Sequence, residues 1–207
     1  MEWNDFYEDD PLFTVDQLPD RHIEEFLYYY NWIDPVSRKA HLQQNYNIKI
    51  LDSGCGAGKN AQLLNVYFKN LYAIDISENA ITKAKHSLPN VHFSVQDARN
   101  LDFTNESFDV IIDAGCLHVI EPKDHQTVID EYYRILQPNG LIFLRLFNLQ
   151  DNPNKFEPIF HVDRHTKSLP VYGFNEAILK ELIKDKFHIE RLIFSGTYHV
   201  YLHKINN

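Results

Sequence analysis

The chain has 207 residues, a length that suits one α/β domain with a sizeable core. Its formal net charge of −9 and the lack of a long basic cluster argue against nucleic acid or an anionic membrane surface as the main partner. No apolar run approaches the ~20 residues of a membrane span, and the acidic, aromatic N-terminus lacks the pattern of a signal peptide. Cys55 and Cys116 suit a reducing compartment, so we expect a cytoplasmic protein.

Residues 1–45 are predicted to form an aromatic and helical cap. Residues 1–19 show no periodicity, and we expect this stretch to cover the active site, with packing on the flank of the sheet as the alternative. Residues 20–44 follow the apolar spacing of a helix, which the Asp34–Pro35 pair interrupts and where a second helix is expected to begin. The first stretch contains four large aromatic residues: Trp3, Phe6, Tyr7 and Phe13.

Residues 46–147 are predicted to form the ligand-binding core, because apolar segments typical of strands alternate there with helical segments of about 10–15 residues. This alternation indicates βαβ units and a parallel sheet. Ser77 is expected to cap one of the helices, and another is predicted from Pro122 to Gln137. The strands are predicted over residues 47–52, 71–76, 91–95, 108–112 and 141–147.

Residues 148–174 contain no clear element, and we expect a substrate loop there because long loops in compact domains are usually functional or mobile. Asn175 is expected to cap a helix that ends near residue 186. Residues 187–194 and 198–204 are predicted strands whose short turn requires antiparallel pairing. The fold class is therefore α/β, a Rossmann-like doubly wound sheet in a single domain over residues 1–207, with residues 175–207 as its C-terminal helix and hairpin.

The stretch of residues 48–58 is typical of a ligand-binding turn, because an apolar run ends at Asp52 and a helical pattern follows the turn. A dinucleotide fingerprint would need its third glycine at Lys59, and Asp52 would repel a pyrophosphate. The spacing of a P-loop is also absent. Asp52 therefore fits better beside a cation. The turn has glycines at alternate positions: Gly54, Gly56 and Gly58.

Acidic residues stand at the ends of four successive predicted strands. The carboxyl ends of parallel strands meet at one edge of a sheet, so we expect these side chains to surround one ligand. Asp75 can accept hydrogen bonds from both hydroxyls of a ribose, as in enzymes that bind NAD or S-adenosylmethionine. Ile76 is expected to lie against the adenine face. The four acids are Asp52, Asp75, Asp97 and Asp113.

The acid followed by G-x-G-x-G at residues 52–58 resembles the first motif of class I S-adenosylmethionine-dependent methyltransferases. Residues 108–118, Pro122 and residues 136–143 resemble the fourth and fifth strands of that family with their linking helix. The resemblance implies a seven-stranded sheet of order 3-2-1-4-5-7-6 with strand seven antiparallel. It also implies S-adenosyl-L-methionine as the cofactor, and an adenine clamp in which Asp97 accepts from the exocyclic amine and Ala98 donates its backbone N–H to a ring nitrogen.

Two further segments, Trp3-x-x-Phe6-Tyr7 and residues 113–118, are similar to small-molecule methyltransferases of the thiopurine and thiol/halide type. The chain departs from that type at Leu12-Phe13, where such proteins carry Pro-Trp. The identity of the methyl acceptor is therefore not determined by this resemblance. The implied reaction is an in-line displacement at the sulfonium methyl group, for which positioning and desolvation do most of the work.

The predicted cofactor-binding residues are Asp52, Gly54, Cys55, Gly56, Gly58, Asp75, Ile76, Asp97, Ala98 and Asp113. The catalytic candidates, for an acceptor whose proton must be removed, are His118, His161 and Tyr172. The predicted substrate contacts are Phe6, Tyr7, Phe13, His118 and His165.

Several alternatives remain at this stage. Arg145 either pairs with an acid or contacts an anionic acceptor. His161 and His165 could ligate a metal together with Cys116 or His118, although we predict no metal site. The cysteines are expected to be small residues of tight loops, with a redox pair as the alternative. The rival functions are a NAD-dependent oxidoreductase and a non-catalytic nucleoside-binding module, and we expect a monomer or a homodimer.

Overall fold

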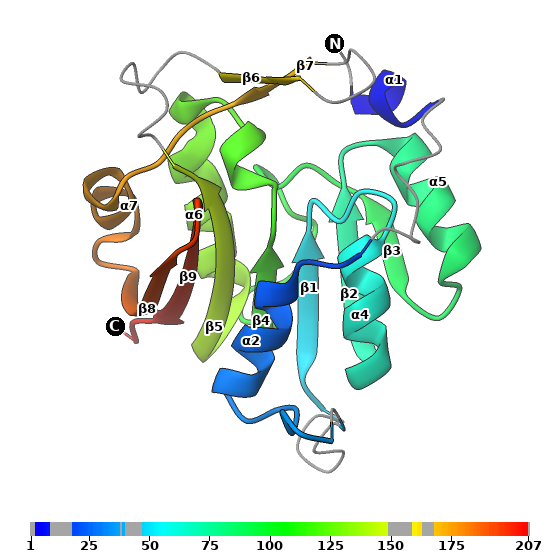
Figure 1. Ribbon diagram of the computed structural model, residues 1–207, viewed down its shortest axis with the longest axis horizontal. Helices are drawn as coiled ribbons and strands as arrows, with labels where there is room; N and C mark the ends of the chain where they lie inside the picture. Colours follow the sequence, from blue (N-terminus) through cyan, green and yellow to red (C-terminus); the bar gives the residue numbers. More distant parts are fainter. Residues whose placement is uncertain are drawn as a thin grey trace.

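A computed structural model describes residues 3–8, 18–37, 39, 47–148, 159–162 and 168–206. Figure 1 shows a central sheet with α2 and α4 on one face and α6 on the other. The helices are α1 (Trp3–Glu8), α2 (Arg21–Tyr29), α4 (Lys59–Tyr67), α5 (Glu78–Ser87), η1 (Leu117–Val119), η2 (Pro122–Asp124), α6 (His125–Ile135) and α7 (Glu176–Ile183). The strands are β1 (Lys49–Ser53), β2 (Asn70–Asp75), β3 (His92–Val95), β4 (Phe108–Asp113), β5 (Leu136–Phe147), β6 (Ile159–Val162), β7 (Ser168–Val171), β8 (Phe187–Phe194) and β9 (Thr197–Lys204).

The main sheet has the strand order β3-β2-β1-β4-β5-β9-β8. Strands β1 to β5 pair in parallel, whereas β9 is antiparallel to both β5 and β8. This arrangement confirms the predicted fold class, including the antiparallel C-terminal hairpin. The parallel strands bring their carboxyl ends to one edge of the sheet, where α1 and the β6–β7 hairpin also lie (Figure 1).

Alternate strand residues face two separate apolar cores, as the two-residue period of a strand requires. Ile50 and Phe143 pack with α2, α4 and α5 on one face of the sheet. Leu51 and Leu144 pack with α6 and α7 on the other face. Burial on both faces explains the continuous apolar runs in the sequence of the central strands.

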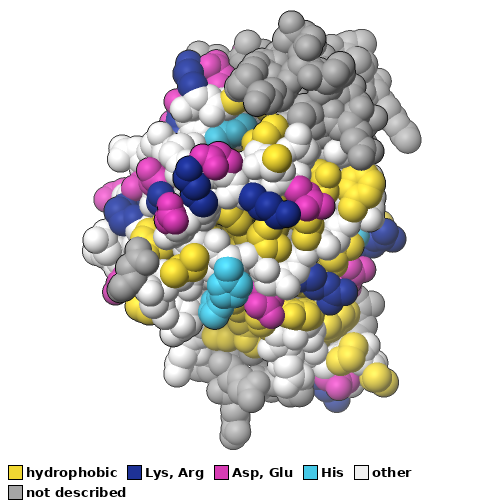
Figure 2. Space-filling model, turned by 90° about the vertical axis from the view of Figure 1, so that its left-hand side faces the viewer, with side chains coloured by type: hydrophobic (Ala, Val, Ile, Leu, Met, Phe, Trp, Pro, Cys, Tyr) yellow, Lys and Arg dark blue, Asp and Glu magenta, His cyan; other side chains and the backbone are white. Residues whose placement is uncertain are grey.

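The two edges of the sheet are β3 and β8. Strand β8 carries exposed charged residues such as Glu190 and Arg191. Charges on an edge strand oppose pairing with the strand of another molecule. Figure 2, which faces the side of the molecule that is on the left in Figure 1, shows acidic and basic side chains interspersed. No helix in the described part of the chain is long and apolar enough to cross a membrane.

The structure corrects the prediction of a helix over residues 20–44. Helix α2 ends at Tyr29, because Asn31 adopts a left-handed backbone conformation with φ of 57°. Asp34 then accepts hydrogen bonds from the backbone nitrogens of Val36 and Ser37, at 3.1 and 2.6 Å, and so closes a turn rather than starting a second helix in the described residues.

Three other predicted boundaries also shift. Residues 148–174 were predicted to lack regular structure, but β6 and β7 form an antiparallel hairpin there. Helix α6 follows a separate 3₁₀ turn at Pro122–Asp124 and ends at Ile135, and β5 already begins at Leu136, which pairs with Phe108. Asn175 caps α7 as predicted, through a 2.9 Å hydrogen bond from the nitrogen of Ile178, but the helix ends at Ile183.

Candidate active site

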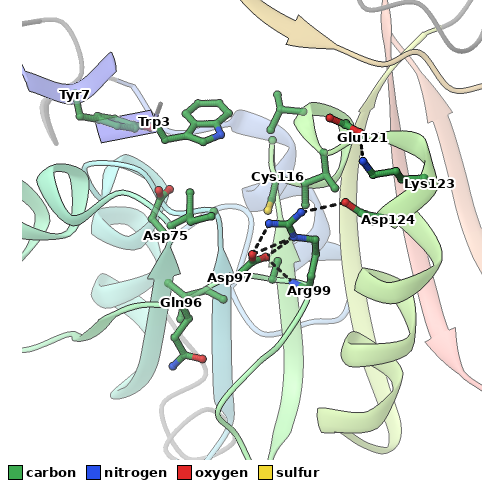
Figure 3. A pocket seen from close by; sticks show the side chains of 17 residues that line it. Trp3, Tyr7, Asp75, Gln96, Asp97, Arg99, Cys116, Glu121, Lys123 and Asp124 are labelled. Atoms are coloured by element: carbon green, nitrogen blue, oxygen red, sulfur yellow. Dashed lines mark hydrogen bonds and ion pairs between the residues drawn. The ribbon is translucent and has the colours of Figure 1, made fainter. Parts of the chain in front are cut away.

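A cavity of about 300 Å³ lies at the carboxyl ends of β1, β2 and β4. This volume is at the small end of the range for sites that bind small ligands. Its walls come from α1, the glycine turn, the ends of β2 and β3, and the connection from β4 to α6 (Figure 3). The lining includes six of the predicted site residues: Tyr7, Gly54, Asp75, Ile76, Asp97 and Ala98.

The glycine turn is packed closely on both sides. Gly54 has φ of 68°, and a Cβ there would lie 2.6 Å from the Cβ of Cys116. Gly56 has φ of 54°, and its Cβ would lie 2.5 Å from the hydroxyl of Tyr7. Both positions therefore require glycine for conformation and for space. A Cβ at Gly58 would instead lie 3.3 Å from the Cβ of Ala84, so this glycine faces α5 rather than the cavity.

Asp52 is a buried carboxylate without a hydrogen-bond partner for its Oδ2 among the described residues. Its side chain is almost fully enclosed, with only 1% of the residue exposed. Burial, together with the charges of Asp113 and Asp75, raises the pKa of Asp52 to about 7, although the nearby Lys59 opposes this shift. Such a group is stabilised by a cation that supplies both a donor and a positive charge.

Asp75 ends β2 with its carboxylate beside the cavity (Figure 3). It accepts hydrogen bonds from the backbone nitrogens of Gly56 and Ser77, at 2.8 and 2.9 Å. These bonds fix the orientation of the carboxylate relative to the glycine turn. Ile76 follows on the cavity wall and is 46% exposed, which leaves an apolar surface next to the carboxylate.

Helix α1 lies across the cavity and contributes Trp3 and Tyr7 to its lining (Figure 3). Asn4 attaches this helix to the start of α5, because its Oδ1 accepts a 3.0 Å hydrogen bond from the Ser77 hydroxyl. Its carbonyl oxygen accepts another, also 3.0 Å long, from the amide of Asn79. The side chain of Phe6 and the whole of Phe13 lie outside the described residues.

Asp97 follows β3 and forms an ion pair with Arg99, which also contacts Asp124. The hydrogen bonds from Arg99 lower the pKa of the Asp97 carboxyl group. Ala98 is buried in the cavity wall. Arg99 and the lining residues Val119, Ile120 and Glu121 are not predicted from the sequence, because they belong to no predicted element or motif.

Asp113 differs from Asp75 and Asp97, which line the cavity. Like Asp52, it is fully buried and is not part of the cavity lining. Its Oδ1 accepts a 2.8 Å hydrogen bond from the nitrogen of Cys116, and its Oδ2 accepts bonds of 3.0 and 2.9 Å from the nitrogen of Leu117 and the hydroxyl of Tyr132. Asp113 therefore shapes the loop after β4 and leaves no oxygen directed into the cavity, contrary to its predicted cofactor contact. Cys55 is likewise buried beneath the turn.

Two of the catalytic candidates, His118 and Tyr172, are not part of the cavity lining. His118 is 3% exposed, and its Nδ1 lies 3.1 Å from the carbonyl oxygen of Arg145. Its carbonyl oxygen accepts a 2.7 Å hydrogen bond from the nitrogen of Tyr172. Gly115 does line the cavity, and a Cβ added there would lie 3.8 Å from Cε1 of His118. The side chain of His161 and the whole of His165 lie outside the described residues.

Arg145 pairs with an acid, which is the first of its two predicted roles. Its Nη1 lies 3.2 Å from Oδ2 of Asp20, so the ion pair joins β5 to the start of α2. Asp20 also accepts a 2.9 Å hydrogen bond from the nitrogen of His22. The rings of His22 and His199 stack with their centroids 3.5 Å apart.

Asp20, His22 and His199 form a group of potential metal ligands in the described part of the chain. A ring nitrogen presents its lone pair in the plane of the ring, and the planes of His22 and His199 are only 19° from parallel. The two lone pairs therefore do not converge on one point. Asp20 is in addition already paired with Arg145. The group does not form a metal centre. The stacking of His22 on His199 instead attaches α2 to β9.

We predict that acid weakens the fold through His199. Burial, with the charges of His22 and Arg145, lowers the pKa of His199 to about 4, whereas an unfolded histidine titrates near ~6.5. Between these values the unfolded chain binds the proton and the folded chain does not. The stability is therefore complete above ~6.5 and falls as the pH drops toward 4. Thermal unfolding should show a smaller loss for His199→Phe than for the wild type or the exposed control His86→Gln, and equal losses would contradict the assignment.

Both cysteines are free thiols. Burial raises the pKa of Cys55 and of Cys116. Cys116 packs against Gly54 and lines the cavity, which agrees with the prediction of small residues in tight loops. A redox pair would need reactive thiolates, which raised pKa values disfavour.

Comparisons with known proteins point to one kind of enzyme. Residues 50–140 match a methyltransferase domain family. An uncharacterized methyltransferase of Schizosaccharomyces pombe is 35% identical over 103 residues, which are 48% of this chain and 71% of that relative. A tRNA N(3)-methylcytidine methyltransferase of the same yeast is 33% identical over 114 residues, 49% of this chain and 37% of that protein. A solved SAM-dependent methyltransferase from Methanosarcina mazei shares the fold, with a TM-score of 0.68 at 20% identity over 84% of this chain and 99% of that one.

Proposed function

Because this chain belongs to the S-adenosylmethionine-dependent methyltransferase family, we propose that it transfers the methyl group to a small-molecule acceptor by in-line displacement. The family membership decides against a NAD-dependent oxidoreductase and favours an enzyme over a non-catalytic binding module. We also propose that residues 1–207 act as a single domain.

The cavity lining fits the cofactor, together with Asp52, which lies near the end of β1 just before the glycine turn. Its methionine ammonium would supply the cation and the donor that Asp52 lacks. Its ribose hydroxyls would donate to Asp75, and its adenine would lie against Ile76 with Asp97 and Ala98 at the edge of the base. When bound, the cofactor supplies a methyl group that a positively charged sulfur has already activated. The chain's part is then to orient the reactants and exclude water.

Among the described residues, the two basic side chains that line the cavity are both paired with acids, which supports a small-molecule acceptor. Arg99 is paired with Asp97 and Asp124, and Lys123 lies 2.6 Å from a carboxylate oxygen of Glu121. Proteins that hold a nucleic acid present basic side chains to its phosphates, whereas these two are already neutralised. The net charge of −9 has the same implication. Trp3 and Tyr7 add an aromatic cover that suits an apolar or aromatic acceptor.

A second candidate function is RNA methylation, which the similarity to the tRNA N(3)-methylcytidine methyltransferase favours. The similarity covers 37% of that protein and so leaves most of its length unmatched. For the small-molecule candidate we propose a thiol acceptor of the thiopurine and thiol/halide type. A thiolate needs no enzymatic base, and neither His118 nor Tyr172 lines the cavity.

Transfer of a labelled methyl group distinguishes these candidates. The purified protein would be incubated with labelled S-adenosylmethionine and, separately, with a panel of thiols, phenols and amines and with total tRNA. We expect label in a thiol or another small acceptor. Label in tRNA alone would overturn the small-molecule proposal. Binding of S-adenosylhomocysteine without transfer to any acceptor in the panel would favour the binding module.

A further inference from the structure

Three charged side chains cross one end of the cavity (Figure 3). The Nε of Arg99 lies 2.9 and 3.0 Å from the two carboxylate oxygens of Asp97, and its Nη2 lies 2.6 Å from Oδ2. The Nη1 on the other edge of the guanidinium donates to Oδ2 of Asp124 at 3.0 Å. Asp97 follows β3 and Asp124 precedes α6, so Arg99 joins two separate walls of the cavity.

The stability of the fold does not explain this arrangement well. The side chains of Arg99, Asp97 and Asp124 are 43%, 32% and 25% exposed. Ion pairs in contact with solvent typically contribute only about 0–1 kcal/mol. A bidentate contact does, however, fix the plane of a carboxylate, because the guanidinium is planar and its donors form a rigid fork.

The lone pairs of Asp97 can be counted. A carboxylate accepts about four hydrogen bonds, two at each oxygen. Oδ1 accepts from the nitrogen and the Nε of Arg99, both at 2.9 Å. Oδ2 accepts from Nη2 and from the same Nε–H, which the two oxygens share. If the longer contact of this shared bond, from Nε to Oδ2 at 3.0 Å, is released, one lone pair of Oδ2 becomes free. The contacts from Nε to Oδ1 and from Nη2 to Oδ2 then remain, so Arg99 still holds the carboxylate at two points.

We propose that Arg99 is a positioning residue that directs the free lone pair of Asp97 at the exocyclic amine of the cofactor's adenine. Arg99 thereby sets the preference for a 6-aminopurine over a 6-oxopurine. The inference rests on the proposed function, in which Asp97 lies at the adenine edge. A 6-oxopurine presents an oxygen at the position from which the amine would donate. A carboxylate held in a fixed orientation repels this oxygen, whereas a carboxylate that can rotate avoids the repulsion. Asp124 accepts a hydrogen bond from the Nη1 of Arg99 and so keeps the Nε and Nη2 donors directed at Asp97.

The preference can be measured by calorimetry with two probes, S-adenosylhomocysteine and S-inosylhomocysteine. The proteins are the wild type, Arg99→Gln, Arg99→Lys and Asp97→Asn. We expect both Arg99 variants to lower the adenine-over-hypoxanthine affinity ratio about tenfold, the size of one weakened hydrogen bond to a charged group. Lysine should not rescue the ratio, because it keeps the charge but not the fork.

Arg134→Lys is a matched control, because Arg134 makes a similar two-point contact with Glu131, at 2.7 and 2.8 Å, but does not line the cavity. Its affinity ratio should equal that of the wild type. If Asp97→Asn lowers the ratio but neither Arg99 variant does, the inference about Arg99 is wrong and the proposed function stands. If the wild type binds neither probe, the proposed function fails, and the role of Arg99 fails with it.

Discussion

Replacement of Asp75 with alanine should weaken the binding of S-adenosylhomocysteine at least about 100-fold, because two ribose hydroxyls lose a charged acceptor worth about 1.5–3 kcal/mol each. The carboxylate is held beside the cavity by hydrogen bonds from the nitrogens of Gly56 and Ser77. Calorimetric titration of the variant measures the loss directly. An unchanged dissociation constant would remove Asp75 from the cofactor site.

The same substitution also removes the acceptor of two backbone N–H groups, so a matched control is needed. Asp75→Asn keeps one carbonyl oxygen and should retain more of the fold, while its affinity still falls. Asp109 accepts a 2.8 Å hydrogen bond from the nitrogen of Lys49 near the amino end of β4, away from the cavity. Asp109→Ala should lower the melting temperature without a change in affinity. An equal affinity loss in this control would mean that the effect of Asp75 is merely one of folding.

The second large effect concerns Asp52, whose pKa of about 7 should make cofactor binding depend on pH. Below that value the carboxyl group is protonated in the free protein, and it must release the proton to pair with an ammonium. The affinity for S-adenosylhomocysteine should therefore fall about tenfold for each pH unit well below 7, or about 25-fold between pH 7.5 and 5.5. Calorimetry in buffers with different ionisation enthalpies should detect the released proton.

Asp52→Asn tests the cause of this pH dependence. The variant keeps the shape but not the charge, so its affinity should be low and independent of pH over this range. Its melting temperature without ligand should not fall, because the substitution removes a buried carboxylate from the neighbourhood of Asp75 and Asp113. Methylthioadenosine lacks the amino-acid tail, and its affinity should not change with pH. A pH-dependent Asp52→Asn variant would place the titrating group elsewhere.

The sequence predicts the fold well where one physical signal dominates. Apolar runs that end in an acid or a turn mark β1, β2 and β4, since strands buried on both faces need continuous apolar residues. The β6–β7 hairpin is not predicted, because Pro170 within β7 argues against a strand. The end of α2 is missed because the aromatic spacing continues past Tyr29, while the left-handed residue Asn31 stops the helix.

The sequence predicts where the backbone places the candidate site, but it predicts the orientations and partners of the side chains less well. Asp75 and Asp97 lie at the cavity because the sheet topology places strand ends there. Asp113 stands at an equivalent strand end but is turned inward, because the following loop and Tyr132 on α6 supply its donors. Contacts between distant segments such as these leave no periodic trace in a sequence. The contact of Arg99 with Asp124 is missed for the same reason.

The Ser77 hydroxyl takes part in two contacts at once. It accepts a 3.2 Å hydrogen bond from the nitrogen of Ala80, which caps α5, and donates one to Asn4 of the cap helix α1. The nitrogen of the same residue donates to Asp75. The floor of the cavity and its roof are thus linked through one serine. A shift of the backbone at the end of β2 would therefore reach α1 through the hydrogen bonds of this single residue.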